Sequence, residues 1–191
     1  VECVDTHARV CNVNINNHKF ETPQFMPVGT KATVKTLDSA DLDDLGFPIV
    51  LANTYHLYLR PGSKRIYDAG GLKKFMAYEG LFLTDSGGFQ VYSLKDLRKI
   101  KEDGVEFRSI IDGSKHFFSP SSVITTQREL GADIMMAFDE CPPGDCDWEY
   151  ARDSMEKTHR WANQCLEAKA DTQNIALGSQ YLFGIIQGGV Y

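Results

Sequence analysis

Apolar runs of strand length alternate along the chain with amphipathic stretches of helix length. The runs with strand character end in polar or glycine residues, and they cover residues 25–29, 48–52, 81–83, 134–138 and 181–186. The helical stretches cover 36–45, 61–69, 119–130 and 148–170, and a further short helix is expected before Gly80. Strands that alternate with helices in this way predict parallel βα units.

One segment departs from this alternation. Residues 105–110 and 115–118 have the pattern of two strands, and Asp112-Gly113 between them is a strong signal for a tight turn. We therefore expect a hairpin over 105–118, inserted between βα units. It either shapes the rim of a site or only covers the core. Residues 1–24 are expected to supply lead-in strands.

Polar side chains stand just past the ends of four different predicted strands, at Asn53, Asp85, Asp139 and Gln187. In a parallel barrel the carboxyl ends of the strands converge on one mouth. An open doubly wound sheet also gathers ligands at its strand ends. The barrel is favoured, because each connection resembles a simple βα step and no glycine-rich dinucleotide fingerprint follows the first strand.

The expected fold is therefore α/β, a (β/α)8 TIM barrel of which the chain covers about the first five βα units. Residues 1–191 would form a single domain, made of the lead-in strands, these units and the inserted hairpin. Since five strands do not close an eight-stranded barrel, we expect the chain to be the N-terminal portion of a longer protein.

Composition narrows the function classes. The chain has 191 residues, of which 42% are hydrophobic and 24% charged, so it can bury a real core. Its net charge of -6 argues against a protein built mainly to coat phosphate backbones. No apolar run approaches the length of a membrane span, and the start VECVDTHARV lacks the order of a signal peptide. A cytoplasmic protein is expected.

The cysteines do not predict a disulfide framework, because there are five of them in a chain of ordinary size. Cys141 and Cys146 are close enough in sequence to suggest a metal pair, but no second Cys or His pair has finger-like spacing. We therefore expect no metal or other cofactor within this chain.

The stretch LTDSGGFQ, residues 83–90, is the densest group of candidate chemistry. A carboxylate at a strand end, followed by Gly87-Gly88, allows a flat ligand to come close to the backbone. Phe89 adds a ring face for stacking, and Gln90 adds an amide that both donates and accepts. Together they predict a slot for a planar, hydrogen-bonding heterocycle. The alternative is that these residues form only a helix N-cap and turn.

Several long motifs carry a family resemblance. They are LTDSGGFQVYSL at 83–94, ANTYHLYLRPG at 52–62, RSIIDGSKHFFSP at 108–120, GADIMMAFDECPP at 131–143 and FGIIQGG at 183–189. In this order the chain resembles the tRNA-guanine transglycosylases, also called queuine tRNA-ribosyltransferases, of the bacterial type. The resemblance runs over nearly the whole chain.

The resemblance implies a base exchange on tRNA. Guanine at the anticodon wobble position is replaced by 7-aminomethyl-7-deazaguanine, a precursor of queuosine. The reaction is similar to that of a retaining glycosidase, because a carboxylate attacks the anomeric carbon and the new base later displaces it. The target nucleotide must leave its stack, which is least costly in an unpaired loop.

The resemblance also assigns roles to residues. Asp85 matches an aspartate that moves protons on the base, and Phe89 matches an aromatic position, often Tyr, that stacks on it. Asp139 matches the aspartate that accepts from the ring N–H and exocyclic amine. Gln187 would donate to the carbonyl of the base. The other residues expected to line the pocket are Asn53, Ser86, Gln90, Cys141 and Gly188. Asn53 is nearly as well explained by bonding a loop backbone, and Cys141 by burial as a small side chain.

Other family features are expected outside this chain. The nucleophilic aspartate, a structural zinc site of three cysteines and a histidine, and most of the tRNA-binding surface belong to the later part of the family's fold. We therefore expect residues 1–191 alone to be inactive. The resemblance implies the tRNA anticodon loop and guanine or 7-aminomethyl-7-deazaguanine as partners, with a homodimer as the full-length form and no membrane contact.

Three alternatives stay open. A non-catalytic subunit or remnant of the same family would keep the fold without exchanging bases. A different TIM-barrel glycosidase with paired carboxylates is less favoured, since such clefts are usually lined with Trp and this chain has two. A pure interaction module fits least well with polar groups at four strand ends.

Overall fold

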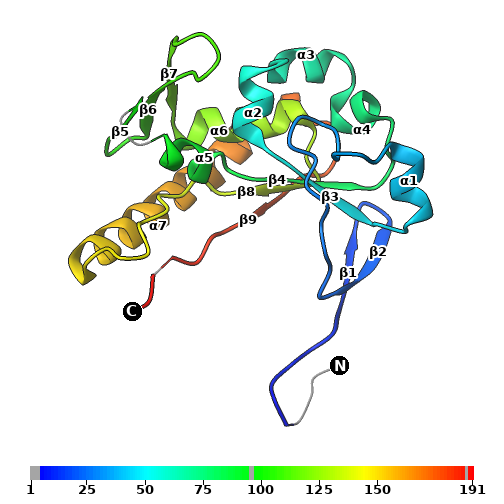
Figure 1. The fold of residues 1–191 in the computed structure, drawn as a ribbon, viewed down its shortest axis with the longest axis horizontal. Coiled ribbons are helices and arrows are strands. Elements are labelled where there is room, and N and C mark those ends of the chain that lie inside the picture. The colour runs from blue at the N-terminus through cyan, green and yellow to red at the C-terminus, as the bar shows by residue number, and fades with distance from the viewer. Residues whose placement is uncertain (1–4, 95–96, 188) are drawn as a thin grey trace.

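The computed structural model describes residues 5–94, 97–187 and 189–191, and its centre is a four-stranded parallel sheet (Figure 1). In spatial order its strands are β3 (Ile49–Ala52), β4 (Leu81–Thr84), β8 (Ile134–Met136) and β9 (Tyr181–Phe183). Each strand pairs in parallel with the next, so that spatial order follows sequence order. The predicted α/β chain with a parallel sheet is confirmed.

The expected first strand, residues 25–29, is reduced to one parallel bridge between Val28 and Leu51. The Gly29 N–H donates to the Leu51 carbonyl at 2.7 Å, and the Leu51 N–H donates to the Pro27 carbonyl at 2.9 Å. Pro27 has no N–H and cannot extend the ladder. The segment therefore lies beside β3, where a preceding parallel strand belongs, but the predicted length was wrong.

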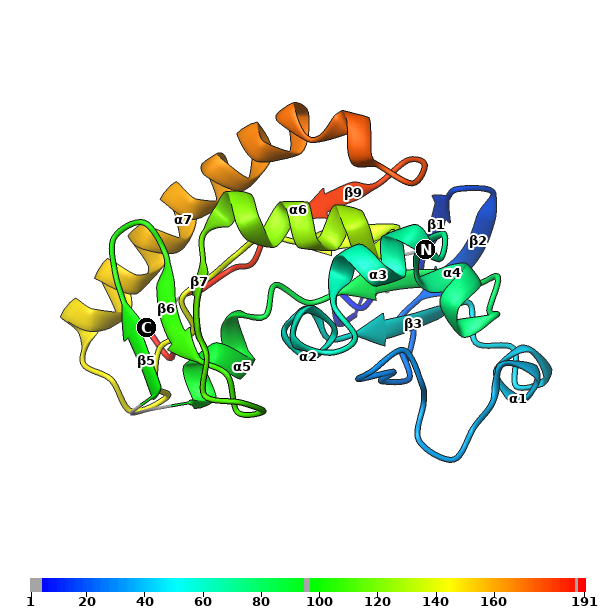
Figure 2. The ribbon, with the colours of Figure 1, turned by 90° about the horizontal axis from the view of Figure 1, so that it is seen from above.

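Helices connect the parallel strands. They are α1 (Ser39–Asp44), α2 (Thr54–Leu59), α3 (Ser63–Asp68), α4 (Gly71–Met76), α5 (Gly88–Ser93), α6 (Pro120–Leu130) and α7 (Trp148–Asp171), with a 3-10 turn, η2, at Gln173–Ile175. The predicted limits of α6 are confirmed. Ser119 caps its start by accepting from the Ser122 N–H at 3.2 Å, and Gly131 ends it with φ 75°. Helices α6 and α7 pack against each other along the sheet (Figure 2).

The amino end of the parallel sheet is closed by an apolar cluster. The antiparallel lead-in strands β1 (Cys11–Ile15) and β2 (His18–Thr22) contribute Ile15, which packs with Ile49, Leu81 and Ile134. The last three are the first residues of β3, β4 and β8. Burial of this end leaves the opposite, carboxyl ends of the strands as the place for polar chemistry.

A second sheet lies at that carboxyl side. Strands β5 (Arg98–Ile100), β6 (Val105–Arg108) and β7 (Lys115–Phe118) form an antiparallel sheet on the side toward which β3 and β9 point (Figure 2). The hairpin predicted between 105 and 118 is confirmed, and Gly113 in its turn has φ 74°. Its partner β5 was not predicted. The inner face of the sheet is buried through Phe107 and Phe118.

Candidate functional site

The parallel strands bring the predicted polar residues together as two hydrogen-bonded groups. Asn53, after β3, donates its side-chain amide to Asp85, after β4. Gln187, after β9, donates to Oδ2 of Asp139, after β8, at 2.7 Å. Ser86 then links the two groups, because its hydroxyl donates to Oδ1 of Asp139 at 2.7 Å.

Asp85 is surrounded by donors. Its Oδ1 accepts from the backbone N–H groups of Thr54 at 2.9 Å and Gly87 at 3.1 Å. Its Oδ2 accepts from the side-chain amides of Asn53 and Gln90, the second at 3.1 Å. Since a carboxylate offers about four lone-pair positions, these donors fill it. Burial raises the pKa of Asp85 and these hydrogen bonds oppose that rise. Proton transfer with a ligand therefore requires one of the side-chain donors to move aside.

Asp139 keeps acceptor capacity. It is 8% exposed, and its side-chain donors are Ser86 and Gln187, one on each oxygen. Burial raises its pKa, and the charge of Asp85 adds to the rise, whereas the hydrogen bonds from Ser86, from its own backbone N–H and from Gln187 oppose it. A ligand with two adjacent N–H donors matches such a carboxylate once Gln187 moves aside.

Glycine is required at position 88. A Cβ there would lie 2.7 Å from both the backbone oxygen and Oδ1 of Asp139, and 3.1 Å from Oγ of Ser86. The Gly88 N–H donates to that Oγ at 3.0 Å. The turn after β4 therefore fits closely against the end of β8, which accounts for the glycine.

The alternative reading of this stretch as a turn is partly correct. Asp85 and Ser86 bond the backbone N–H groups of Gly87 and Gly88, as turn residues do. Gly87 is the N-cap of α5 and no side chain caps it. Both polar side chains, however, also bond groups from other strand ends. They therefore join the strand ends as well as forming the turn.

Gln90 has an unused acceptor. Its Nε2 donates to Asp85, whereas its buried Oε1 has no hydrogen-bond partner among the described residues. Turning the amide round would place its oxygen against the carboxylate, so the orientation is fixed. A buried acceptor without a partner costs about 1–3 kcal/mol, which an N–H group of a ligand would recover.

The remaining predicted residues lie around these carboxylates. Phe89 on α5 is 62% exposed, so its ring is free to stack on a planar ligand. Burial raises the pKa of the Cys141 thiol, the charge of Asp139 adds to the rise and Arg98 opposes it. The thiol is therefore kept protonated, which argues against a nucleophilic role. Gly188 lies outside the described residues.

Sequence reasoning missed two residues beside the site. Thr54 makes two hydrogen bonds to Asp85: its backbone N–H donates to the carboxylate, and its hydroxyl donates to the Asp85 carbonyl at 2.5 Å. Its position directly after Asn53 was the available signal. Glu140, next to Asp139, is buried with Lys157 at 2.7 Å and the Tyr150 hydroxyl at 2.6 Å. These partners account for its burial as an ion pair that anchors the loop after β8 to α7.

Within residues 5–94, 97–187 and 189–191, no three His, Cys, Asp or Glu side chains gather closely enough to hold a metal ion. Over the same ranges, none of the helices combines the length and apolar character needed to cross a bilayer.

Comparison with known proteins adds the family. A family model described as queuine tRNA-ribosyltransferase matches residues 3–191. A queuine tRNA-ribosyltransferase from Thermoanaerobacter sp. (strain X514) is 55% identical over 186 residues, which are 97% of this chain and 48% of that protein. Those from Symbiobacterium thermophilum and Macrococcus caseolyticus are 55% and 54% identical, over 96% and 99% of this chain and 45% and 48% of their own lengths. The chain spans about half the length of these curated relatives.

Proposed function

The chain belongs to the queuine tRNA-ribosyltransferase family, and on that premise we propose that the protein replaces guanine at the wobble position of tRNA anticodons with 7-aminomethyl-7-deazaguanine. This exchange is a step in making queuosine. The proposed partners are the anticodon loop and the two bases, the active form is a homodimer, and the protein works in the cytoplasm.

One observation carries the proposal: a buried carboxylate with spare acceptor capacity, Asp139, lies beside a second, half-buried carboxylate, Asp85. Guanine and its 7-deaza analogues present a ring N–H next to an exocyclic amine. Asp139 accepts from both groups, and Phe89 stacks on the ring plane. When the base displaces Gln187 from Asp139, the freed amide donates to the base carbonyl.

Asp85 moves the proton in this scheme. Guanine must gain a proton to leave, and the incoming base must lose one to attack the sugar. Because burial raises its pKa, Asp85 can hold a proton closer to neutral pH than an exposed aspartate can. Release of Gln90 or Asn53 from Oδ2 opens the position that meets the base. The base exchange proceeds through a covalent enzyme–tRNA intermediate formed by another carboxylate, and the two inversions give net retention at the sugar.

The proposal for the fold is a (β/α)8 barrel with the site at its mouth. The parallel order of β3, β4, β8 and β9, and the bridge from Val28 to β3, support consecutive strands of such a barrel. In this proposal the lead-in of residues 1–24 contributes β1 and β2, with residues 1–4 outside the described residues, and 105–118 is an inserted hairpin in the same domain. A structural zinc site belongs to another part of the family's fold. Residues 1–191 alone are proposed to bind the base without exchanging it.

The test is base exchange by the protein as encoded in its source. Purified protein is incubated with an unmodified substrate tRNA and radiolabelled guanine, beside an equal amount of residues 1–191 alone. Label enters tRNA with the first sample and not with the second. If neither sample exchanges the base, the proposed function is contradicted. If the 191 residues exchange it at the rate of the encoded protein, the proposal that they bind the base without exchanging it is contradicted.

A further inference from the structure

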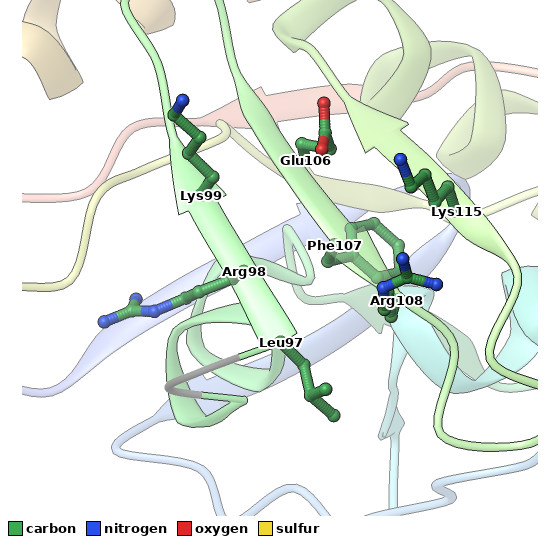
Figure 3. Close-up of a pocket in the computed structure, with 7 residues that line it drawn as sticks. All are labelled: Leu97, Arg98, Lys99, Glu106, Phe107, Arg108 and Lys115. Atoms are coloured by element: carbon green, nitrogen blue, oxygen red, sulfur yellow. The ribbon is translucent and has the colours of Figure 1, made fainter.

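The outer face of the β5–β7 sheet is strongly basic. Side chains alternate across a strand, so Glu106 and Arg108 point away from the buried Phe107. Lys99 lies opposite Glu106, and Lys115 lies opposite Arg108. These residues surround a hollow of about 160 Å³ (Figure 3). With the neighbouring Lys101, the basic residues form what we call the cationic face: Lys99, Lys101, Arg108 and Lys115.

Little of this charge is neutralised. Glu106 is the one carboxylate among the described residues that line the hollow, and Lys101 already binds it at 3.1 Å. Arg108 uses Nη1 to donate to the Gly113 carbonyl at 3.1 Å, which leaves most of its donors free. The hollow therefore carries excess positive charge in a chain whose net charge is -6.

The pairing of Arg108 with Lys115 is costly by itself. Like charges directly opposite on neighbouring antiparallel strands destabilise a sheet. An anion held between them removes that repulsion. The register therefore points to a ligand that brings negative charge to this face.

The cationic face lies next to the candidate site. On the buried side of the same sheet, the Phe118 ring lies against Gly87: a Cβ added to this glycine would be 3.1 Å from the ring. The centroids of the Phe107 and Tyr55 rings are 5.5 Å apart, and Tyr55 directly follows Thr54. The sheet stands at the carboxyl side of the parallel strands (Figure 2). A chain that delivers a base to the strand ends can therefore continue over the outer face of the sheet.

We propose that the cationic face binds the sugar–phosphate backbone of the RNA whose base enters the site, an inference that rests on the proposed function. Lys and Arg side chains supply phosphate contacts, and the Leu97 and Phe117 side chains, 43% and 38% exposed, border them with apolar surface for sugar or base. Backbone contacts position the nucleic acid and carry no sequence information. A local basic face is thus how an acidic chain holds RNA.

The main experiment removes three positive charges from the face. The protein as encoded in its source is compared with the variant K99Q/R108Q/K115Q and with a matched control that removes three exposed charges elsewhere, K19Q/R65Q/K74Q. The probe is an unmodified RNA stem-loop with a single-stranded loop containing guanine. At about 0.1 M salt the first variant binds the RNA about tenfold more weakly, and the salt slope falls by about 2, as expected for three phosphates of a single strand. The control binds the RNA with an affinity within about twofold of wild type and keeps the wild-type salt slope.

Two further variants test the cationic face even if the triple variant folds poorly. Glu106→Gln removes the one competing carboxylate and frees Lys101, so RNA binding becomes tighter. The variant K99R/R108K/K115R keeps every charge and retains the wild-type affinity. Weaker binding by Glu106→Gln, or loss of binding by the charge-preserving variant, overturns the proposal.

The remaining outcomes separate this proposal from the proposed function. Normal RNA affinity in K99Q/R108Q/K115Q, with base exchange intact, overturns the cationic face as an RNA site and leaves the function standing. Weaker RNA binding in a protein that never exchanges bases supports the face and contradicts the function. If the variant changes only the oligomeric state in sedimentation, the face binds a second copy of this acidic chain, which overturns the RNA proposal.

Discussion

The Ser86 hydroxyl donates to Oδ1 of Asp139 at 2.7 Å, across 53 positions of sequence. This bond joins the turn after β4 to the end of β8. The same hydroxyl accepts from the Gly88 N–H, so the turn, the serine and the carboxylate are held as one unit. The site's geometry therefore depends on backbone placement as much as on the acidic side chain.

Replacement of Asp139 by Asn should lower base exchange while the fold persists. The new amide would set a donor against a donor of the base, a buried mismatch that costs about 1–3 kcal/mol, or roughly 5- to 150-fold in rate. The measurement is kcat/KM for guanine exchange, with circular dichroism to check the fold. Asp145→Asn, at an exposed position of the following loop, is the control. Exchange within a factor of about two of wild type would contradict the assignment.

A methyl group at position 88 should damage the site. In Gly88→Ala the Cβ would meet Asp139 at 2.7 Å, so the turn or the carboxylate must shift. Overpacking of this kind costs about 1–3 kcal/mol. The melting temperature and the affinity for guanine should both fall. Gly144→Ala is the matched control, since a Cβ at that position meets open space. It should change neither the melting temperature nor the affinity for guanine. Equal behaviour of the two variants would show that the close contact does not matter.

The stability of the protein should depend on pH through Asp139. Burial raises its pKa above the ordinary 3.8, so the unfolded chain loses this proton at a lower pH than the folded chain does. The stability that the protonated group contributes is complete below the ordinary value and is lost as pH rises through the folded pKa. Compared with wild type, Asp139→Asn should thus gain relative stability from about pH 4 upward. Thermal unfolding across pH measures this, and a constant difference would contradict the raised pKa.

Asp85→Asn should slow turnover without abolishing the covalent enzyme–tRNA species. If Asp85 only moves protons, another carboxylate still attacks the sugar. Incubation with tRNA followed by a denaturing gel detects the trapped species, and a filter assay measures tRNA binding. Trapping in wild type but none in the variant, with tRNA binding unimpaired, would instead make Asp85 the nucleophile.

Part of this arrangement could be predicted from sequence because its signals are local. Asp85 and Asp139 stand just past apolar runs, and a carboxylate in that position is expensive to bury without partners. Ser119-Pro120 and Gly131 mark the two ends of α6 by their capping chemistry.

Other features depend on contacts that sequence does not display. Helices α2 and α5 have six residues each, too few to show a helical period, and β5 has three. The Gln187 amide donates to Asp139, a pairing that is set by the register of β8 with β9 and that no local pattern in the sequence indicates. The two hydrogen bonds from Thr54 to Asp85 likewise follow from the pairing of β3 with β4.

The Phe118 ring lies against Gly87, so the cationic face and the candidate site are on opposite sides of one thin sheet. If RNA binding on the outside changes the affinity for a free base by some factor, thermodynamic linkage requires the base to change the affinity for RNA by the same factor. Cooperativity between the two substrates can then be measured from either side. A Phe118→Leu variant that loosens the packing would weaken both effects equally.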